Sequence, residues 1–274
     1  MTQALLGPRR LRALLAEHNV APRKELGQNF VIDPNTVNKI VDVSGAGEDD
    51  HVVEIGAGAG SLTLALAPRV ARITAIEFDR ALLPVLTAVV GGLDNVEVVN
   101  ADALRFDLAS VEANTLMGNL PYNIAATIVL RALEDAPQLV TLTVMTQREV
   151  GERLAARPGS KDYGATSVLV RYFGEARVAA RVSRRSFYPV PNVDSVIVRI
   201  VRDVGSSPVA YDHFRRVVKA AFSQRRKMLR NTLATTAAST DSAQEALRRA
   251  GLAATARAEE IDFDGFVAVA IALA

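Results

Sequence analysis

The chain contains residue types whose spacing could bind a nucleoside. Gly56, Gly58 and Gly60 alternate in the run EIGAGAG, directly after an apolar stretch, which predicts a turn between a strand and a helix. Glycine suits such a turn because a Cβ would block the backbone from approaching a ligand. Glu77 comes 21 residues after Gly56, at the end of the next predicted strand, where a carboxylate can accept both ribose hydroxyls. Asp102 follows the third strand and could accept from an adenine amino group.

A second segment, Asn119-Leu120-Pro121-Tyr122, has the residue types needed to hold an aromatic amine. The lone pair of such an amine is conjugated into its ring, and two acceptors on its N–H bonds favour the nucleophilic form. Asn119 offers a side-chain carbonyl, while Leu120, preceding a proline, is biased to an extended backbone that can turn its own carbonyl to the same place. Pro121 adds no competing N–H donor. Tyr122 offers a ring face for a base and for positive charge.

A sheet is needed to bring these residues to one edge. Apolar runs and breakers alternate as strand and helix up to about residue 200, which predicts a parallel sheet covered on both faces. The predicted strands are residues 51–55, 73–77, 96–100, 115–118, 141–147, 176–182 and 194–202. The predicted helices are residues 34–44, 61–67, 81–90, 125–135, 148–156 and 165–172. The last two strands lack a crossover helix, which favours an antiparallel edge on the otherwise parallel sheet. The expected fold class is therefore α/β, a Rossmann-like sheet followed by a small all-α domain.

Composition narrows the class of protein. The 274 residues include no cysteine, which excludes disulfides, thiolate metal sites and a cysteine nucleophile. The three histidines are scattered without metal-ligand spacing, so no metal site is predicted. No apolar stretch approaches the roughly 20 residues that cross a bilayer, and the N-terminus lacks a signal-type core. We expect a cytoplasmic protein without membrane contact.

Positive charge gathers at the two ends of the chain. Residues 1–30 include five basic and two acidic residues. Residues 205–274 include ten basic and seven acidic residues. The run FRRVVKAAFSQRRKMLRN, residues 214–231, has seven basic residues and no acidic one, which suits an anionic partner such as RNA. A linker-like Gly-Ser-Ser-Pro at residues 205–208 predicts a domain boundary. We expect one domain over residues 1–204 and a helical, basic domain over residues 205–274.

The glycine turn distinguishes between two kinds of nucleoside cofactor. The dinucleotide fingerprint spaces its glycines G-x-G-x-x-G, whereas here the third glycine comes one residue early. The pattern with a preceding acid resembles that of class I S-adenosylmethionine-dependent methyltransferases. Asn-Leu-Pro-Tyr resembles the N-P-P-Y type motif of enzymes that methylate exocyclic amines on bases. A nicotinamide oxidoreductase is the disfavoured alternative.

Four further segments resemble one family, the ribosomal RNA adenine dimethyltransferases. ELGQNFVIDPNTVNKIV resembles the family's L-G-Q-N-F-L segment, with valine in place of the last leucine. Residues 145–173 resemble its Q-K-E-V-A-x-R-L and Y-G-x-L-S-V run. SFYPVPNVDSVIVRI resembles its F-x-P-x-P-x-V-D-S strand, and AFSQRRKMLRN resembles its F-x-x-R-R-K-x-L-x-N segment. The matches run in order from about residue 24 to 231, and the chain is identified as a member of the small-subunit type.

The resemblance assigns a function and roles to residues. It implies transfer of methyl groups from S-adenosylmethionine to N6 of two adjacent adenines near the 3′ end of 16S rRNA, in an assembling 30S subunit. The implied cofactor contacts are Asn29, Val31, Gly56, Gly58, Glu77, Asp102 and Asn119. The implied catalytic residues are Asn119, Leu120, Pro121, Tyr122 and Phe187, with Phe187 facing the base opposite Tyr122. The expected RNA contacts are Arg215, Arg216, Arg225, Arg226, Lys227 and Arg230, with Arg9, Arg10 and Arg12 from the N-terminus. Arg225 and Arg226 could instead brace the two domains, and a monomer is expected.

Two other functions stay open from the sequence. The sister group that methylates 23S rRNA and confers macrolide resistance shares the cofactor motifs, and the P-x-P-x-V-D-S strand and R-R-K segment argue against it. A largely non-catalytic ribosome assembly factor with the same fold is the other. Cysteine-dependent methylation of pyrimidine C5 is excluded because the chain has no thiol.

Overall fold

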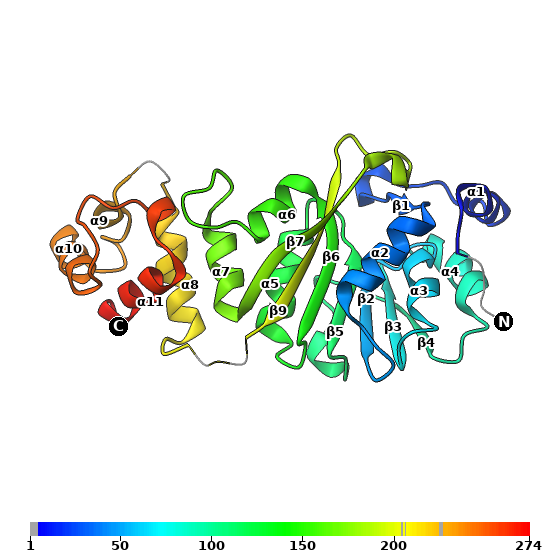
Figure 1. Cartoon of the computed structure of the whole chain (residues 1–274), viewed down its shortest axis with the longest axis horizontal. Coiled ribbons are helices and arrows are strands. Elements are labelled where there is room, and N and C mark those ends of the chain that lie inside the picture. Colours follow the sequence, from blue (N-terminus) through cyan, green and yellow to red (C-terminus); the bar gives the residue numbers. More distant parts are fainter. Residues whose placement is uncertain (1–4, 204, 206, 225–226) are drawn as a thin grey trace. The chain divides into compact units, whose positions relative to one another are not determined.

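The chain forms a seven-stranded sheet with helices around it (Figure 1). The computed structural model describes residues 5–203, 205, 207–224 and 227–274. The strand order is β4-β3-β2-β5-β6-β9-β7, with parallel pairing from β4 through to β6 and antiparallel pairing of β9 with β6. A separate two-stranded sheet joins β1 to β8. The α/β fold class is confirmed, and the antiparallel strand β9 lies one position in from the edge strand β7.

The elements begin and end close to the predicted positions. The strands are β1 (Phe30–Val31), β2 (His51–Ile55), β3 (Arg72–Glu77), β4 (Val96–Asn100), β5 (Thr115–Asn119), β6 (Thr141–Gln147), β7 (Gly174–Val182), β8 (Phe187–Tyr188) and β9 (Ser195–Arg202). The α-helices are α1 (Pro8–Glu17), α2 (Pro34–Ser44), α3 (Ser61–Leu66), α4 (Leu83–Val90), α5 (Ala125–Asp135), α6 (Arg148–Leu154), α7 (Ala165–Phe173), α8 (Tyr211–Ala221), α9 (Leu229–Thr232), α10 (Thr240–Arg249) and α11 (Phe263–Ala272). Short 3₁₀ turns are η1 (Lys24–Leu26), η2 (Arg80–Leu82), η3 (Leu108–Ser110), η4 (Arg184–Ser186) and η5 (Ala258–Glu260).

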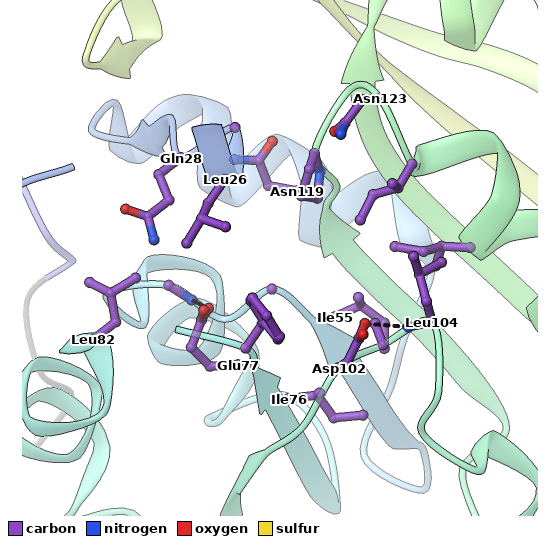
Figure 2. Close-up of a pocket in the computed structure, with 18 of the residues that line it drawn as sticks. Leu26, Gln28, Ile55, Ile76, Glu77, Leu82, Asp102, Leu104, Asn119 and Asn123 are labelled. Atoms are coloured by element: carbon purple, nitrogen blue, oxygen red, sulfur yellow. Dashed lines mark hydrogen bonds between the residues drawn. The ribbon is translucent and has the colours of Figure 1, made fainter. Parts of the chain in front are cut away.

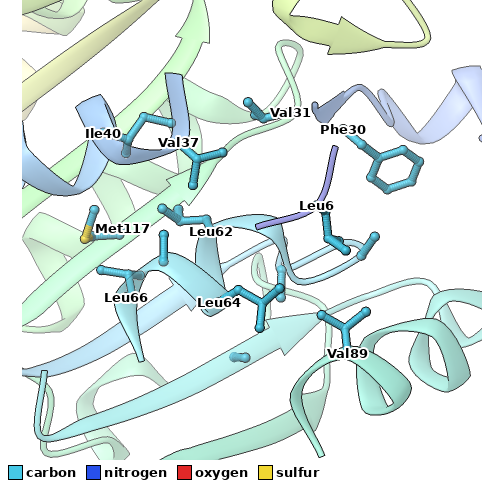
Figure 3. Close-up of a cluster of buried hydrophobic side chains, with 14 of the residues drawn as sticks. Leu6, Phe30, Val31, Val37, Ile40, Leu62, Leu64, Leu66, Val89 and Met117 are labelled. Carbon is cyan, nitrogen blue, oxygen red and sulfur yellow. The ribbon is translucent and has the colours of Figure 1, made fainter. Parts of the chain in front are cut away.

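The central strands β3, β2, β5 and β6 are buried on both faces, as a parallel sheet with helical crossovers requires. One cluster of buried side chains lies between one face of the sheet and the four helices α1, α2, α3 and α4 (Figure 3). The cluster includes side chains that point to this face of the sheet from its strands, such as Val52, Met117 and Ile197. Their neighbours Val53 and Leu116 are equally buried but lie outside that cluster, so they face the opposite side. The strand ends are therefore held firmly at one edge, where the loops that carry the candidate site emerge.

The contacts divide the chain into two compact units. The first comprises Met1–Gly151 and Arg177–Arg202, and the second comprises Glu152–Ala176 and Asp203–Ala274. In the second unit, α8 packs against α7 and α11, and Phe214, Val217, Val218 and Ala221 form its buried stripe. Thus α7 and the segment before it group with the C-terminal helices, and the boundary at residue 204 stays a prediction. Among the described helices, none has both the length and the apolar character needed to span a bilayer.

Candidate active site

The turn between β2 and α3 has the backbone that its glycines predict. Gly56, Gly58 and Gly60 have φ angles of 74°, 59° and 84°, in the left-handed region that other residues rarely adopt. A Cβ on Gly58 would also lie 3.2 Å from the ring of Phe30. The N–H groups of Gly56 and Ala57 donate to the Ile76 carbonyl of β3, which ties the turn to the neighbouring strand. The turn therefore brings bare backbone to the carboxyl edge of the sheet.

The acid before this turn is buried and stabilises the first crossover. Glu54 on β2 is 1% exposed, and Thr63 Oγ1 on α3 donates to its Oε2 at 2.7 Å. Burial raises the pKa of Glu54 to about 8, although the Thr63 hydrogen bond acts in the opposite direction. The carboxyl is therefore protonated at neutral pH, and it holds β2 and α3 together rather than facing a ligand.

We expect Glu54→Gln to flatten the pH dependence of stability. The unfolded chain ionises this carboxyl above its ordinary pKa of 4.5, whereas the folded chain keeps it protonated up to about pH 8. The free energy of unfolding therefore falls as pH rises through this window, by up to about 1.4 kcal/mol per pH unit. Urea unfolding of both proteins between about pH 5 and pH 8 measures the two slopes. Equal slopes would show that the carboxyl is already ionised in the folded protein.

Glu77 lies at the end of β3 and faces a cavity of about 280 Å³ (Figure 2). Its Oε2 accepts from the N–H of Gly58 at 2.7 Å, and its Oε1 accepts from the N–H of Asp79 at 2.8 Å. Burial raises the pKa of Glu77, and these two backbone hydrogen bonds oppose that effect. Each carboxylate oxygen keeps a second lone pair, so the side chain is held in place and can still accept from a diol.

An apolar slot and a second acid lie beside Glu77. Asp102 Oδ1 accepts from the N–H of Leu104 at 2.9 Å, which fixes the carboxylate at the cavity wall. Phe78, directly after Glu77, lines the same cavity and is 55% exposed, and Leu104 and Ile128 line it as well. An exposed aromatic ring beside a polar acceptor suits a purine. Phe78 was not among the residues predicted from the sequence, although an aromatic residue following the strand-end acid is a usable signal.

Asn119 ends β5 and lies on the opposite side of the cavity from Glu77 (Figure 2). Its Nδ2 donates to the carbonyl of Asn29 at 2.7 Å, which fixes the orientation of the amide. In the described part of the chain, no hydrogen bond reaches Asn119 Oδ1 or the carbonyl of Leu120. The N–H of Leu120 donates to the Met145 carbonyl of β6, which anchors the segment to the sheet. Asn119 Oδ1 is therefore left available beside the cavity, whereas Leu120 is 1% exposed and outside the cavity lining, so the role of its carbonyl stays a prediction.

The predicted site residues divide into two groups. Those that line the cavity are Asn29, Gly56, Gly58, Glu77, Asp102, Asn119 and Pro121. Those that do not are Val31, Leu120, Tyr122 and Phe187. The side chain of Val31 is buried, and its carbonyl accepts from Ser61 Oγ at the start of α3. The role of Val31 as a direct cofactor contact stays a prediction.

The two aromatic rings expected to hold a base differ in exposure. Tyr122 is half-buried, its hydroxyl lies 2.9 Å from Ser195 Oγ, and burial raises its pKa. Phe187 is 0% exposed, because β8 pairs with β1 and its ring joins the hydrophobic cluster of that region. In this structure the Phe187 ring therefore presents no open face, and its stacking role stays a prediction that requires the side chain to become exposed.

Comparisons with known proteins place the chain in a family. Residues 19–274 match the family model of the ribosomal RNA adenine dimethylases. The chain belongs to this family. It is 45% identical to the ribosomal RNA small subunit methyltransferase A of Rhodococcus opacus, over 97% of this chain and 94% of that protein. It is 43% identical to the protein of the same name from Thermobifida fusca, over 97% of this chain and 95% of that protein.

Two solved structures have folds similar to that of this chain. A dimethyladenosine transferase from Plasmodium falciparum superposes with a TM-score of 0.77 at 23% identity, covering 86% of this chain and 94% of that one. The 23S rRNA methyltransferase ErmE superposes with a TM-score of 0.71 at 28% identity, covering 89% and 99%. The dimethylase is therefore an S-adenosylmethionine-dependent enzyme that methylates adenine in ribosomal RNA.

The cavity of this dimethylase fits S-adenosylmethionine. The diol acceptor Glu77, the exposed Phe78 and the bare backbone at Gly58 meet the needs of the ribose, the adenine and the methionine part attached to the ribose. Asn119, across the cavity from Glu77, would lie near the transferable methyl group of a cofactor held there. We propose that these residues form the cofactor site.

The described basic residues expected to contact RNA lie on α8, on α9, in the segment just before α9, and on α1. Arg216 and Lys227 are exposed, whereas Arg215 is partly covered and pairs with Asp212 at 3.2 Å. Arg230 on α9 is partly covered as well. On α1, Arg9 and Arg10 are exposed, and the guanidinium of Arg12 lies 4.7 Å from the ring centroid of Tyr188. Arg225 and Arg226 lie outside the described residues. The RNA contacts stay predictions.

Proposed function

We propose that this dimethylase converts two adjacent adenines near the 3′ end of 16S rRNA to N6,N6-dimethyladenine during assembly of the 30S subunit. We further propose that it acts as a monomer in the cytoplasm. The observation that carries the proposal is the orientation of Asn119. Its Nδ2 is held by the Asn29 carbonyl, so its Oδ1 is left to accept from a substrate amine beside the cofactor cavity.

The acceptor segment supports methylation of an exocyclic amine. Asn119 Oδ1 accepts one N–H of adenine N6, and the Leu120 carbonyl accepts the other. Holding both N–H bonds turns the nitrogen lone pair out of conjugation and toward the cofactor. S-adenosylmethionine, when bound, supplies an electrophilic methyl group on a sulfonium. The methylated nitrogen becomes acidic and loses a proton to water, so no side chain is needed as a general base. Most of the rate enhancement then comes from alignment and from acceptors already in place.

The second methylation has to use the same residues with one N–H fewer. After the first transfer and loss of a proton, the amine carries one methyl and one hydrogen. Rotation about the C6–N6 bond lets either Asn119 Oδ1 or the Leu120 carbonyl accept the remaining hydrogen. Tyr122 supports this reorientation because stacking on its ring holds the base and leaves the amine free to turn. Base stacking of this kind contributes about 1–3 kcal/mol, which offsets part of the cost of extruding the base.

The substrate choice rests on similarity within the family. The relatives named as small-subunit methyltransferases are about 45% identical over nearly the whole chain, whereas the 23S rRNA methyltransferase ErmE is 28% identical. The 23S alternative is therefore the weaker one, and a non-catalytic assembly factor has no support from the Asn119 geometry, which is suited to transfer.

The proposal is tested by mass spectrometry of rRNA after incubation with isotope-labelled S-adenosylmethionine. We expect label in two adjacent dimethyladenines of 16S rRNA when immature 30S particles are the substrate. The same reaction on 50S particles serves as the control and should leave 23S rRNA unlabelled. Label in 23S rRNA would assign the protein to the resistance type. Tight binding to 30S particles without any label would make it an assembly factor instead.

A further inference from the structure

One wall of the cofactor cavity is a short segment with little structure of its own. Residues 23–29, called the strap here, contain a single 3₁₀ turn followed by Gly27 in the left-handed region. Five consecutive strap residues, 25–29, line the cavity. Every strap residue is exposed or only partly buried, so core packing does little to hold the strap in position. Its place over the cavity must depend on specific contacts at its ends.

Asp79 provides the contact at the ribose end. Its Oδ2 accepts from Gln28 Nε2 at 2.8 Å, and its Oδ1 lies 3.3 Å from Arg23 Nη1. The Gln28 side chain is itself held, because its Oε1 accepts from the N–H of Arg23 at 2.8 Å. The Asp79 carboxylate is only 4% exposed. A carboxylate that is removed from water depends on such donors, so it gives the strap a strong anchor.

The same residue is connected to the acid that faces the ribose. The N–H of Asp79 donates to Glu77 Oε1 at 2.8 Å. At the other end of the strap, the Asn29 carbonyl accepts from Asn119 Nδ2 at 2.7 Å. The strap is thus fastened once beside Glu77 and once beside Asn119. Its position affects both the cofactor wall and the orientation of the acceptor amide.

We propose that Asp79 is a positioning residue that latches the strap over the cofactor through Gln28 and Arg23. The latch slows escape of S-adenosylmethionine and keeps Asn29 against Asn119. This inference rests on the cofactor site proposed above. Asp79 does not line the cavity, and its effect on the cofactor is carried by the strap.

The direction of the Gln28–Asp79 hydrogen bond allows a sharp test. Gln28→Glu places two carboxylates against each other, and we expect the dissociation constant for S-adenosylmethionine to rise about tenfold or more. Asp79→Asn weakens the anchor, and we expect it to raise the dissociation constant for S-adenosylmethionine about threefold to tenfold. The combination Gln28→Glu with Asp79→Asn restores one donor facing one acceptor, and the carboxylate introduced at position 28 can still accept from the N–H of Arg23. We expect this swapped pair to return to within about threefold of the wild type.

A second measurement reports the latch without any cofactor. Hydrogen exchange of the strap amides in the free protein should be faster in both single variants and close to wild type in the swapped pair. Asp107→Asn is the matched control, because Asp107 caps η3 through the N–H of Ala109 just as Asp79 caps η2 through the N–H of Ala81. That variant should change neither the affinity nor the strap exchange.

The outcomes separate a latch from a structural role. A swapped pair as weak as Gln28→Glu alone, or strap exchange that is the same in all variants, would overturn the proposal. If the wild type itself fails to bind S-adenosylmethionine, the proposed cofactor site is wrong, while the exchange data still decide whether Asp79 holds the strap.

Discussion

Asn119→Ala should lower the turnover number by about 10²–10³-fold, as expected when a preorganised group that stabilises developing charge is removed. The alanine variant loses the Oδ1 acceptor, so only the Leu120 carbonyl remains to hold the amine. Cofactor affinity should change much less, by less than about tenfold, because the proposed diol and base contacts lie at Glu77, Phe78 and Asp102. Single-turnover assays with labelled donor measure the chemical step, and calorimetry measures the affinity.

Asn123→Ala is the matched control for this experiment. Asn123 is an exposed asparagine that lines the same cavity, and it has no assigned part in holding the amine. We expect its turnover to stay within a few-fold of the wild type. If Asn119→Ala and Asn123→Ala behave alike, the acceptor role of Asn119 has to be given up.

Glu77→Ala should have the largest effect on cofactor binding. The variant removes the carboxylate proposed to accept from two ribose hydroxyls, and hydrogen bonds to charged groups contribute about 1.5–3 kcal/mol each. It also leaves the buried N–H groups of Gly58 and Asp79 without their acceptor. We expect the dissociation constant for S-adenosylmethionine to rise about 100-fold or more, with a smaller change in turnover at saturating cofactor.

Glu97→Ala controls for the loss of a strand carboxylate. Glu97 on β4 is exposed and pairs with Arg72 at 2.8 Å, away from the cavity lining. Its removal should leave cofactor affinity unchanged, since a surface ion pair contributes little. An unaltered dissociation constant in Glu77→Ala would show that the diol binds elsewhere.

Local sequence patterns were enough to predict which residues lie at the carboxyl ends of the first strands of the sheet. The turn at Gly56 and Gly58 follows from the need for positive φ after a strand, and Glu77 follows from the end of the next strand. Such features depend on a few consecutive residues and on the fixed geometry of a parallel crossover. The strand and helix positions could be predicted for the same reason.

Features that depend on distant pairings could not be predicted. The full burial of Phe187 arises because β8 pairs with β1, which lies far earlier in the chain. The latch between Gln28 and Asp79 and the bond from Asn119 to Asn29 likewise join separate segments. The grouping of α7 with the C-terminal helices depends on tertiary contacts as well. None of these leaves a periodic signal in the sequence.

The most direct test of the central claim is a crystal structure with bound S-adenosylhomocysteine, the product of methyl transfer. We expect the ribose hydroxyls on Glu77, the adenine beside Phe78 with its amino group at Asp102, and the sulfur facing Asn119 Oδ1. A cofactor found outside this cavity, or one whose sulfur points away from Asn119, would contradict the claim that this amide and the Leu120 carbonyl hold the amine for transfer.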